Sequence, residues 1–332
     1  MFKRRKKIKI FLSSLFLALI IIMVGCKKEE IIVEEINSLE LFNGAIAVEN
    51  SNEYSIYNKI NDNYEKVNTN YLISSYNLNN NSFIFNDDGK MKVNYNGKEI
   101  DIEEDKNIIS PKLSIMGEYL LYFIKDEYLQ LKIKNLAKDE DIDFNSNVMI
   151  SGDLVEWLSE DSLIYYGIDN NKNNGIFIYD FIEEKERLLY KLDNGFLEYM
   201  RVFDNLIIFT QSNFSKEKSI KIISKSGEII EEINGVKDVN DIEYTEDGLF
   251  ILGKFKDNNY SIYQYKDGNL KRLVYDFPKI INLEKGLSID KDGNILFVGN
   301  NEINKEKIYM YSNESIVSLD AIEGNYFFID VR

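Results

Sequence analysis

Seven short apolar segments recur along this sequence at a nearly constant spacing. Each is four or five residues long and consists mostly of Ile, Leu, Val, Phe, Tyr or Ala. They begin at residues 45, 82, 119, 162, 206, 249 and 295, so neighbouring segments start 37 to 46 residues apart. Apolar runs this short, bounded by Asn, Asp, Gly and Lys, indicate buried β-strands. A period of about 40 residues with four strands per unit is typical of a β-propeller.

The unit at residues 241–275 shows the order of strands and turns. Its four strand segments are separated by turn residues and span residues 241–244, 249–252, 260–265 and 270–275. The second is apolar throughout, as expected of a strand covered on both faces by neighbouring blades. The outer two alternate, as expected of strands with one face in water. The sequence therefore predicts an all-β fold over residues 37–332: a β-propeller with seven blades of four antiparallel strands.

Closure of the ring leaves alternatives open. Residues 326–331 form an extra strand-like segment, and residues 31–33 form another near the opposite end of the chain. Either segment could complete a blade begun at the other terminus. The second and third units are the least regular, so six or eight blades remain alternatives.

The turn before the apolar strand points to a family of propellers. It reads Thr-Glu-Asp-Gly at residues 245–248, Asp-Lys-Asp-Gly at 290–293 and, more weakly, Ser-Glu-Asp at 159–161. A Tyr-Ser-Ile-Tyr pattern follows at residues 54–57 and 260–263. These features resemble the repeats of TolB-like propellers and of the propeller domain of prolyl oligopeptidase-type proteins. Those families carry Ser-Pro-Asp-Gly at this turn, and the Pro is missing here. The resemblance implies a fold and no particular function.

The N-terminus has the pattern of an export signal. Six Lys and Arg residues lie between positions 3 and 9, and an apolar run follows from Ile10 to Val24. The run is short for a membrane-spanning helix and has the length of a signal-peptide core. It ends in Met23-Val24-Gly25-Cys26, which resembles the lipobox of bacterial lipoproteins, with Met23 in place of the usual Leu. The basic cluster keeps this end cytoplasmic, so the rest of the chain is exported.

The lipobox resemblance implies a lipid anchor. A diacylglyceryl group would be attached to the thiol of Cys26, and the signal peptidase would cut between Gly25 and Cys26. Residues 1–25 are then the signal peptide, and residues 26–36 are the lipidated cysteine and a short tether. The protein is expected at the cell membrane, held by its lipid on the extracytoplasmic face. Cys26 is the only cysteine, so we expect no internal disulfide.

Composition excludes several classes of function. The net charge is −16, and removal of the six basic residues of the signal makes it about −22. Such a surface repels nucleic acid, so we expect no nucleic-acid partner. The sequence has no His, which removes the usual Ser-His-Asp and Cys-His arrangements and the commonest zinc ligand. We predict no catalytic residues, no metal and no cofactor.

Three features of the sequence are candidates for a binding or catalytic site. The loop at residues 169–175 has oxygen-bearing side chains spaced as in a calcium loop, but its Gly falls one position late, which favours an exposed hairpin. Trp157 is either a ligand platform near the propeller axis or a blade-packing residue, and packing is favoured. Acidic clusters at residues 101–105, 139–141 and 231–232 could serve a glycosidase, although no pair has a marked spacing.

The sequence therefore predicts a membrane-anchored extracytoplasmic lipoprotein that is not an enzyme. Its propeller would act as a protein-interaction or scaffold module with a protein partner. Two alternatives stay open: a receptor for a small sugar or peptide ligand in the axial cavity, and a hydrolase or lyase of cell-surface polymers.

Overall fold

The computed structural model describes residues 39–332, except residues 52, 70, 103–106, 257 and 302–304. Leu39–Arg332 form one compact unit. The predicted signal peptide and tether lie outside the described residues, as do Gly25 and Cys26, so the lipoprotein interpretation stays a prediction. In the part of the chain that is described, no helix is long and apolar enough to cross a membrane.

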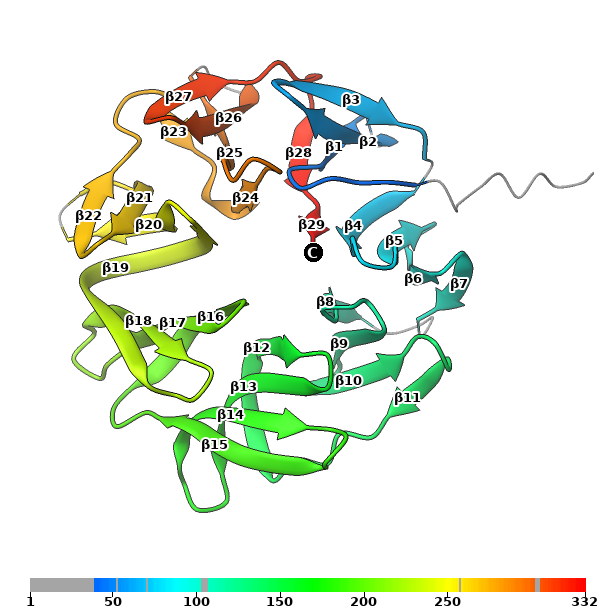
Figure 1. Cartoon of the computed structure of the whole chain (residues 1–332), viewed down its shortest axis with the longest axis vertical. Coiled ribbons are helices and arrows are strands. Elements are labelled where there is room, and N and C mark those ends of the chain that lie inside the picture. Colours follow the sequence, from blue (N-terminus) through cyan, green and yellow to red (C-terminus); the bar gives the residue numbers. More distant parts are fainter. Residues whose placement is uncertain (1–38, 52, 70, 103–106, 257, 302–304) are drawn as a thin grey trace, which may run out of the picture. The chain divides into compact units, whose positions relative to one another are not determined.

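Antiparallel sheets are arranged around a common centre, as the predicted propeller requires (Figure 1). Three blades are built from consecutive strands, each running from the innermost strand outward. Blade II contains β4 (Leu72–Tyr76), β5 (Phe83–Asp87), β6 (Lys90–Tyr95) and β7 (Lys98–Asp101). Blade III contains β8 (Ile108–Leu113), β9 (Tyr119–Lys125), β10 (Leu129–Asn135) and β11 (Glu140–Ile142). Blade IV contains β12 (Val148–Ser159), β13 (Ser162–Asp169), β14 (Asn174–Asp180) and β15 (Lys185–Lys191).

Blades V and VI are joined by one long strand. Its 17 residues, β19 (Ile229–Thr245), pair with β18 through their first half and with β20 through their second half. Blade V contains β16 (Phe196–Phe203), β17 (Leu206–Ser212), β18 (Lys218–Ser224) and the start of β19. Blade VI contains the end of β19, β20 (Gly248–Phe255), β21 (Ser261–Lys266) and β22 (Asn269–Arg272). The resulting seven-stranded sheet therefore counts as two blades.

The C-terminal segment closes the ring. Blade VII contains β23 (Ile280–Ile281), the 3-10 helix η2 (Leu283–Lys285), β24 (Leu287–Ile289), β25 (Ile295–Asn300), β26 (Glu306–Ser312) and β27 (Ser315–Ser318). Blade I takes its innermost strand from the end of the chain: β28 (Asn325–Phe328), β1 (Ile46–Asn50), β2 (Glu53–Ile60) and β3 (Asn63–Val67). β29 (Asp330–Val331) then pairs in parallel with β4 of blade II.

The described residues thus form seven blades, which confirms the predicted all-β propeller. Of the two segments considered for closure, residues 326–328 fill this role by pairing with β1, with Ile46 opposite Phe328 and Val48 opposite Tyr326. The other candidate, at residues 31–33, lies outside the described residues. Closure of the ring by antiparallel pairing gives blade I the four strands that the other blades have.

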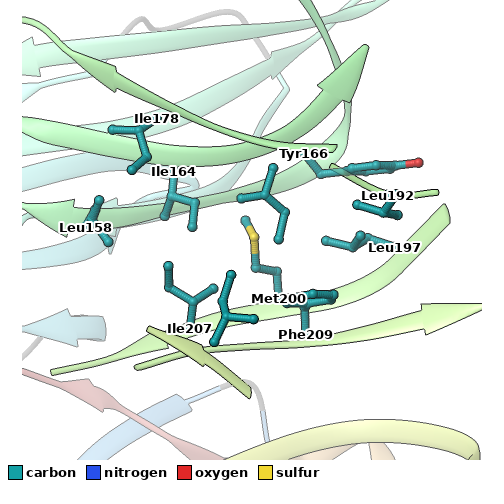
Figure 2. Close-up of a cluster of buried hydrophobic side chains, with 11 residues drawn as sticks. Leu158, Ile164, Tyr166, Ile178, Leu192, Leu197, Met200, Ile207 and Phe209 are labelled. Carbon is teal, nitrogen blue, oxygen red and sulfur yellow. The ribbon is translucent and has the colours of Figure 1, made fainter. Parts of the chain in front are cut away.

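The repeat in the sequence arises from packing between blades. In β17, Ile207 and Phe209 belong to the apolar cluster between blades IV and V, whereas Ile208 belongs to the cluster between blades V and VI. All three side chains are fully buried. Figure 2 shows the first of these clusters, with Ile207, Met200 and Phe209 facing Ile164 across the space between the two blades. Burial of each such side chain contributes about 1.5–3 kcal/mol.

Trp157 is a packing residue, as the favoured interpretation predicted. Its side chain is 2% exposed and lies in the cluster between blades III and IV. Its ring centroid is 6.1 Å from that of Tyr119 and 6.0 Å from that of Phe181. Its indole N–H donates to the carbonyl oxygen of Lys112 at 3.1 Å. Because the side chain is buried and its donor is in use, Trp157 is not available as a platform for a ligand.

Candidate functional site: the axial cavity

A cavity of about 500 Å³ lies where the innermost strands of the blades meet. Its wall is contributed by β8, β12, β16, β19, β24, β28 and β29, which surround the C-terminal end of the chain in Figure 1. Charged side chains of both signs line it: Lys112, Asp153, Glu156, Arg201, Asp241, Glu243, Lys285, Asp330 and Arg332. Five carboxylates therefore face four cations.

The alternation of side chains along each strand places these charged groups at the axis. Successive side chains of a strand point to opposite faces. On β19, Asp241 and Glu243 line the cavity, whereas Ile242 between them is fully buried in the core of blades V and VI. On β16 the same alternation holds over residues 199–201, whose middle residue, Met200, contributes to the core of blades IV and V.

Arg201 is shared by the two carboxylates of β19. Its Nη1 lies 2.7 Å from Glu243 Oε1 and 3.3 Å from Asp241 Oδ1. The same nitrogen donates to the carbonyl oxygen of Ile242 at 2.8 Å. One guanidinium nitrogen therefore lies between two carboxylates and is further held by the backbone of β19.

Asp241 is saturated with donors. Its Oδ1 accepts from the Tyr199 hydroxyl at 3.0 Å and from the Ile242 N–H at 2.9 Å. Its Oδ2 accepts from the Leu287 N–H at 2.7 Å. Because Leu287 belongs to blade VII, this carboxylate connects three successive blades. Its role in the wall is therefore structural as well as electrostatic.

The electrostatics of this cluster depart from ordinary values. Burial raises the pKa of Glu243 to about 7, against the opposing effect of Arg201. The pKa of Tyr199 is also raised, first by burial and then by the charge of Asp241. Burial acts to lower the pKa of Arg201, but Glu243 and the neighbouring acids outweigh it and raise that pKa. Glu243 is thus the group of this cluster that changes charge near neutral pH.

A second charged cluster also lines the cavity. Lys112 Nζ is 2.7 Å from Glu156 Oε1 and donates to the Val155 carbonyl oxygen at 2.8 Å. Arg332 Nη2 is 3.9 Å from Glu156 Oε2, and Arg332 Nε is 2.8 Å from Asp330 Oδ2. These two cations and two carboxylates balance one another, so this part of the wall is neutral as a group.

Lys285 of η2 has a different environment. Its ammonium donates to Asn325 Oδ1 at 2.6 Å and lies 3.7 Å from the centroid of the Phe327 ring. An amide oxygen and an aromatic face both stabilise a cation without neutralising it. Lys285 therefore keeps its net charge at the edge of the cavity.

The structure does not bring the sequence candidates together into one site. Asp169 accepts from the Asn173 N–H and its side-chain amide, both at 2.8 Å, so it closes a hairpin as the favoured interpretation predicted. Asp139 is paired with Lys98 at 3.1 Å and Lys134 at 2.9 Å, whose hydrogen bonds lower its pKa. Residues 103–105 of the first acidic cluster lie outside the described part of the chain. Within the described ranges, no group of three or more acidic or thiol side chains is placed to hold a metal ion.

The axial charges were not identified as a site from the sequence. They come from different blades, one or two residues each, so no local spacing marks them. The available signal is a polar–apolar–polar triplet in the first strand of a unit, such as residues 199–201 and 241–243. In a propeller the first strand of each blade lies at the axis. The two polar residues of such a triplet are therefore predicted to face the axial cavity.

Comparisons with known proteins support the fold. No protein-family model matches the sequence, and no curated protein is significantly similar to it. Among solved structures, the uncharacterized protein lmo1340 from Listeria monocytogenes EGD-e is 9% identical, with a TM-score of 0.57 over 84% of this chain and 91% of that one. The Pyrococcus horikoshii acylaminoacyl peptidase is 13% identical, with a TM-score of 0.57 over 81% of this chain. TolB from Acinetobacter baumannii is 12% identical, with a TM-score of 0.48 over 86% of this chain.

The propeller fold that the sequence resemblance implied is thereby confirmed by the two structures with a TM-score of 0.57. The chain covers 48% of the acylaminoacyl peptidase and 66% of TolB, so it spans only part of each. At identities of 9 to 13%, these likenesses concern the fold alone.

Proposed function

We propose that this protein is a lipid-anchored, extracytoplasmic binding module that is not an enzyme and recognises a protein partner. One observation carries the proposal: the exposed aromatic side chains gather on one face of the propeller. Aromatic residues are enriched in protein interfaces and supply much of the binding energy there.

Two faces are distinguished by their connections. The turn face carries the turns that join the first to the second and the third to the fourth strand of each blade. The loop face carries the loops that join the second to the third strand and each blade to the next. Of nine exposed aromatic residues in the described ranges, seven lie at the loop face: Tyr54, Tyr128, Phe196, Phe214, Tyr260, Tyr275 and Phe277.

The chain enters the domain on the opposite face. The carbonyl oxygen of Leu39 lies 3.0 Å from the hydroxyl of Tyr76, whose strand ends at the turn face. Asn58, near the turn-face end of β2, donates to the Glu40 carbonyl oxygen at 2.8 Å. The first described residues therefore lie at the turn face and do not cover the aromatic loop face, which supports the proposal.

The anchor is tested by Cys26→Ser. We expect this variant to remain as an unprocessed precursor without lipid, because both lipid attachment and cleavage depend on the thiol. Metabolic labelling with a fatty acid and the size of the protein on a gel measure the two steps. Cleavage after Gly25 in the variant, with retention at the membrane, would show that the lipoprotein interpretation is wrong.

The partner is tested by position-specific crosslinking in living cells. A photoreactive amino acid replaces Phe214 or Tyr275 on the loop face, and Ile182 or Ile230 on the turn face serves as the matched control. All four side chains are at least 57% exposed, so a photoreactive group at any of them is comparably accessible to a partner. We expect the same crosslinked protein from both loop-face positions and not from the turn-face positions. Equal crosslinking from both faces, or none from the loop face, would contradict the proposal.

A polymer hydrolase remains the competing class, with Asp241 and Glu243 as its acids. The raised pKa of Glu243 suits a general acid. However, Arg201 Nη1 lies between the two carboxylates, at 2.7 and 3.3 Å, where a scissile bond would have to be. Hydrolysis of a cell-surface polymer that Glu243→Gln abolishes would overturn the non-enzymatic proposal.

A further inference from the structure

Glu243 has a carboxylate oxygen that nothing in the described residues satisfies. Its side chain is 8% exposed, and its one polar contact among these residues is Arg201 Nη1, 2.7 Å from Oε1. The residue lines the axial cavity, and its second oxygen is not among the fully buried side-chain atoms that lack a partner, so this oxygen is reached from that space. Buried carboxylates ordinarily accept several hydrogen bonds, and leaving an acceptor unpaired is unfavourable. This oxygen is therefore placed to receive a donor from the cavity.

Arg201 gives Glu243 a donor that it shares with other acceptors. Its Nη1 is already shared with Asp241 and with the Ile242 carbonyl oxygen. Asp241 in turn is satisfied by donors from Tyr199, Ile242 and Leu287. Of the two carboxylates in this cluster, Glu243 therefore has the fewer donors among the described residues.

The surrounding charge favours a cationic donor. The charged groups that act on Glu243 are Arg201, Asp241 and Asp330, and Arg332 pairs with Asp330 at 2.8 Å. Three carboxylates thus stand against two guanidinium groups at this side of the cavity. Each additional positive charge brought here gains attraction in a site that is partly shielded from water.

We propose that the axial cavity binds an organic cation, a primary ammonium or a guanidinium group, through the free carboxylate oxygen of Glu243. The site goes beyond the proposed function, because it is distinct from the aromatic loop face. A cavity of about 500 Å³ is large enough for a polyamine or for a Lys or Arg side chain of a peptide. The cation would donate to the free oxygen of Glu243 and balance the one negative charge that is in excess when Glu243 is ionised.

Binding of a cation is coupled to release of a proton. Because the pKa of Glu243 is about 7, roughly half of the free protein carries a proton there at neutral pH. A bound ammonium stabilises the ionised carboxylate, so binding must expel that proton. Affinity should therefore rise with pH between about 6 and 8. The other charged or titratable groups facing this site are Tyr199 and Arg201, whose pKa values are raised well above their ordinary values, and Asp241, Asp330 and Arg332.

Calorimetry on the full-length protein in detergent tests the proposal. Spermidine is the free probe, acetyl-Lys-Lys-Lys-amide is the peptide probe, and succinate is the anionic control. We expect saturable binding of at least one cation, no binding of succinate, and release of about half a proton at pH 7. The proton count comes from the difference in binding heat between two buffers of unlike ionisation enthalpy. Binding of spermidine indicates a free amine, whereas binding of the peptide alone indicates a basic segment of a partner.

Glu243→Gln distinguishes this site from general attraction to an acidic protein. This near-isosteric variant should bind the cation at least tenfold more weakly and should release no proton on binding. Glu246→Gln, an exposed neighbour on the turn face, removes the same charge and should leave both unchanged. Absence of saturable binding in the millimolar range, or equal affinity in the two variants, would overturn the proposal and leave water as the partner of Glu243. Crosslinking from the loop face does not depend on Glu243, so failure here and failure of the proposed function are separate results.

Discussion

Asp290, at the seam between blades VII and I, and Glu243, in the wall of the axial cavity, are both buried, at 2% and 6% exposed. Each is paired with a single cationic side chain, Lys59 at 2.8 Å and Arg201 at 2.7 Å. Their pKa values nevertheless move in opposite directions. Burial acts to raise the pKa of Asp290, but hydrogen bonds from Lys59 and Asn294 outweigh it, and that pKa is lowered. For Glu243 burial prevails, and the pKa rises to about 7.

The number of donors explains the difference. Besides Lys59, Asp290 accepts from the N–H groups of Asp292 and Asn294, both at 2.9 Å, and from the Asn294 amide at 3.0 Å. Glu243 has Arg201 alone among the described residues, and Arg201 is shared. A buried carboxylate with a full set of donors stabilises the fold, whereas one with an empty position is available for a ligand. The same residue chemistry therefore serves structure at one place and binding at the other.

The largest effect should come from breaking the satisfied pair. Asp290→Asn keeps an acceptor for the turn but leaves the ammonium of Lys59 buried and uncompensated. Removal of one partner of a buried pair costs about 3–5 kcal/mol. We expect a loss of this size in the free energy of unfolding, measured with urea and the fluorescence of Trp157.

A double variant controls for the chemistry of the pair. Adding Lys59→Met to Asp290→Asn removes the stranded charge and should restore part of the lost stability. A loss below about 1 kcal/mol in the single variant would mean that water reaches Lys59, and the contrast between the two carboxylates would then fail.

The pH dependence of stability should separate the two carboxylates. The folded pKa of Glu243, about 7, lies above the ordinary 4.5, so the folded protein holds this proton more tightly than the unfolded chain does. Stability must then fall as the pH rises from about 4.5 to about 7, by about 3 kcal/mol at most. Asp290 acts in the opposite sense, because its folded pKa is lowered. Its contribution is present above its ordinary value and is lost as the pH falls through the lower folded value.

Glu243→Gln isolates the first of these effects. The variant removes the titrating group, so its stability should change less between pH 4.5 and 7, and near pH 7 it should exceed that of the unmodified protein by about 2–3 kcal/mol. Urea unfolding at several pH values measures the difference between the two proteins. Parallel pH profiles would show that Glu243 is hydrated and titrates normally.

Sequence periodicity predicted the fold because packing between blades imposes it. The second strand of each blade is covered on both sides, as Ile207 and Ile208 show, so it is apolar throughout and recurs in every unit. The merging of blades V and VI through β19 was not predicted. The residues that join its two halves, 234–238, include the pair Asn234-Gly235, which is typical of turns, but here Gly235 adopts a positive φ of 83° within the continuous strand.

The candidate site was harder to predict for a geometrical reason. Arg201, Asp241 and Glu243 lie close in space because adjacent blades place their first strands side by side. The two acids follow Arg201 by 40 and 42 residues, which is about the length of one unit. Acids that are clustered in the sequence, such as Asp139 and Glu231, were the predicted candidates for a site. These are satisfied by lysines and by the Tyr265 hydroxyl, respectively. Which acids line the same cavity depends on the topology of the fold and not on their spacing in the sequence.

Removal of a half-buried carboxylate whose oxygens accept several hydrogen bonds should have an intermediate effect on stability. Glu160 connects the turns of blades III and IV by accepting from the Ser114 hydroxyl at 2.6 Å and from the N–H groups of Met116 at 2.7 Å and Glu118 at 3.3 Å. Glu160→Ala removes these bonds, but solvent can replace some of them. We expect a loss of about 1–2 kcal/mol in urea unfolding. A loss as large as that of Asp290→Asn would mean that donor number alone, without burial, sets the contribution.

The smallest effect is expected at an exposed pair. Lys185 Nζ lies 2.9 Å from Glu183 Oε2, which is as short as the Lys59–Asp290 pair, but the two side chains are 74% and 58% exposed. In water the attraction is screened and opposed by the entropy of ordering two long side chains. Lys185→Ala should therefore leave the urea midpoint unchanged, and added salt should not alter that result. If this variant shifted the midpoint as far as Glu160→Ala, the distance between the charges would matter more than their burial. The argument that assigns structure to Asp290 and binding to Glu243 would then lose its basis, because it depends on what surrounds each carboxylate and not on how close its partner lies.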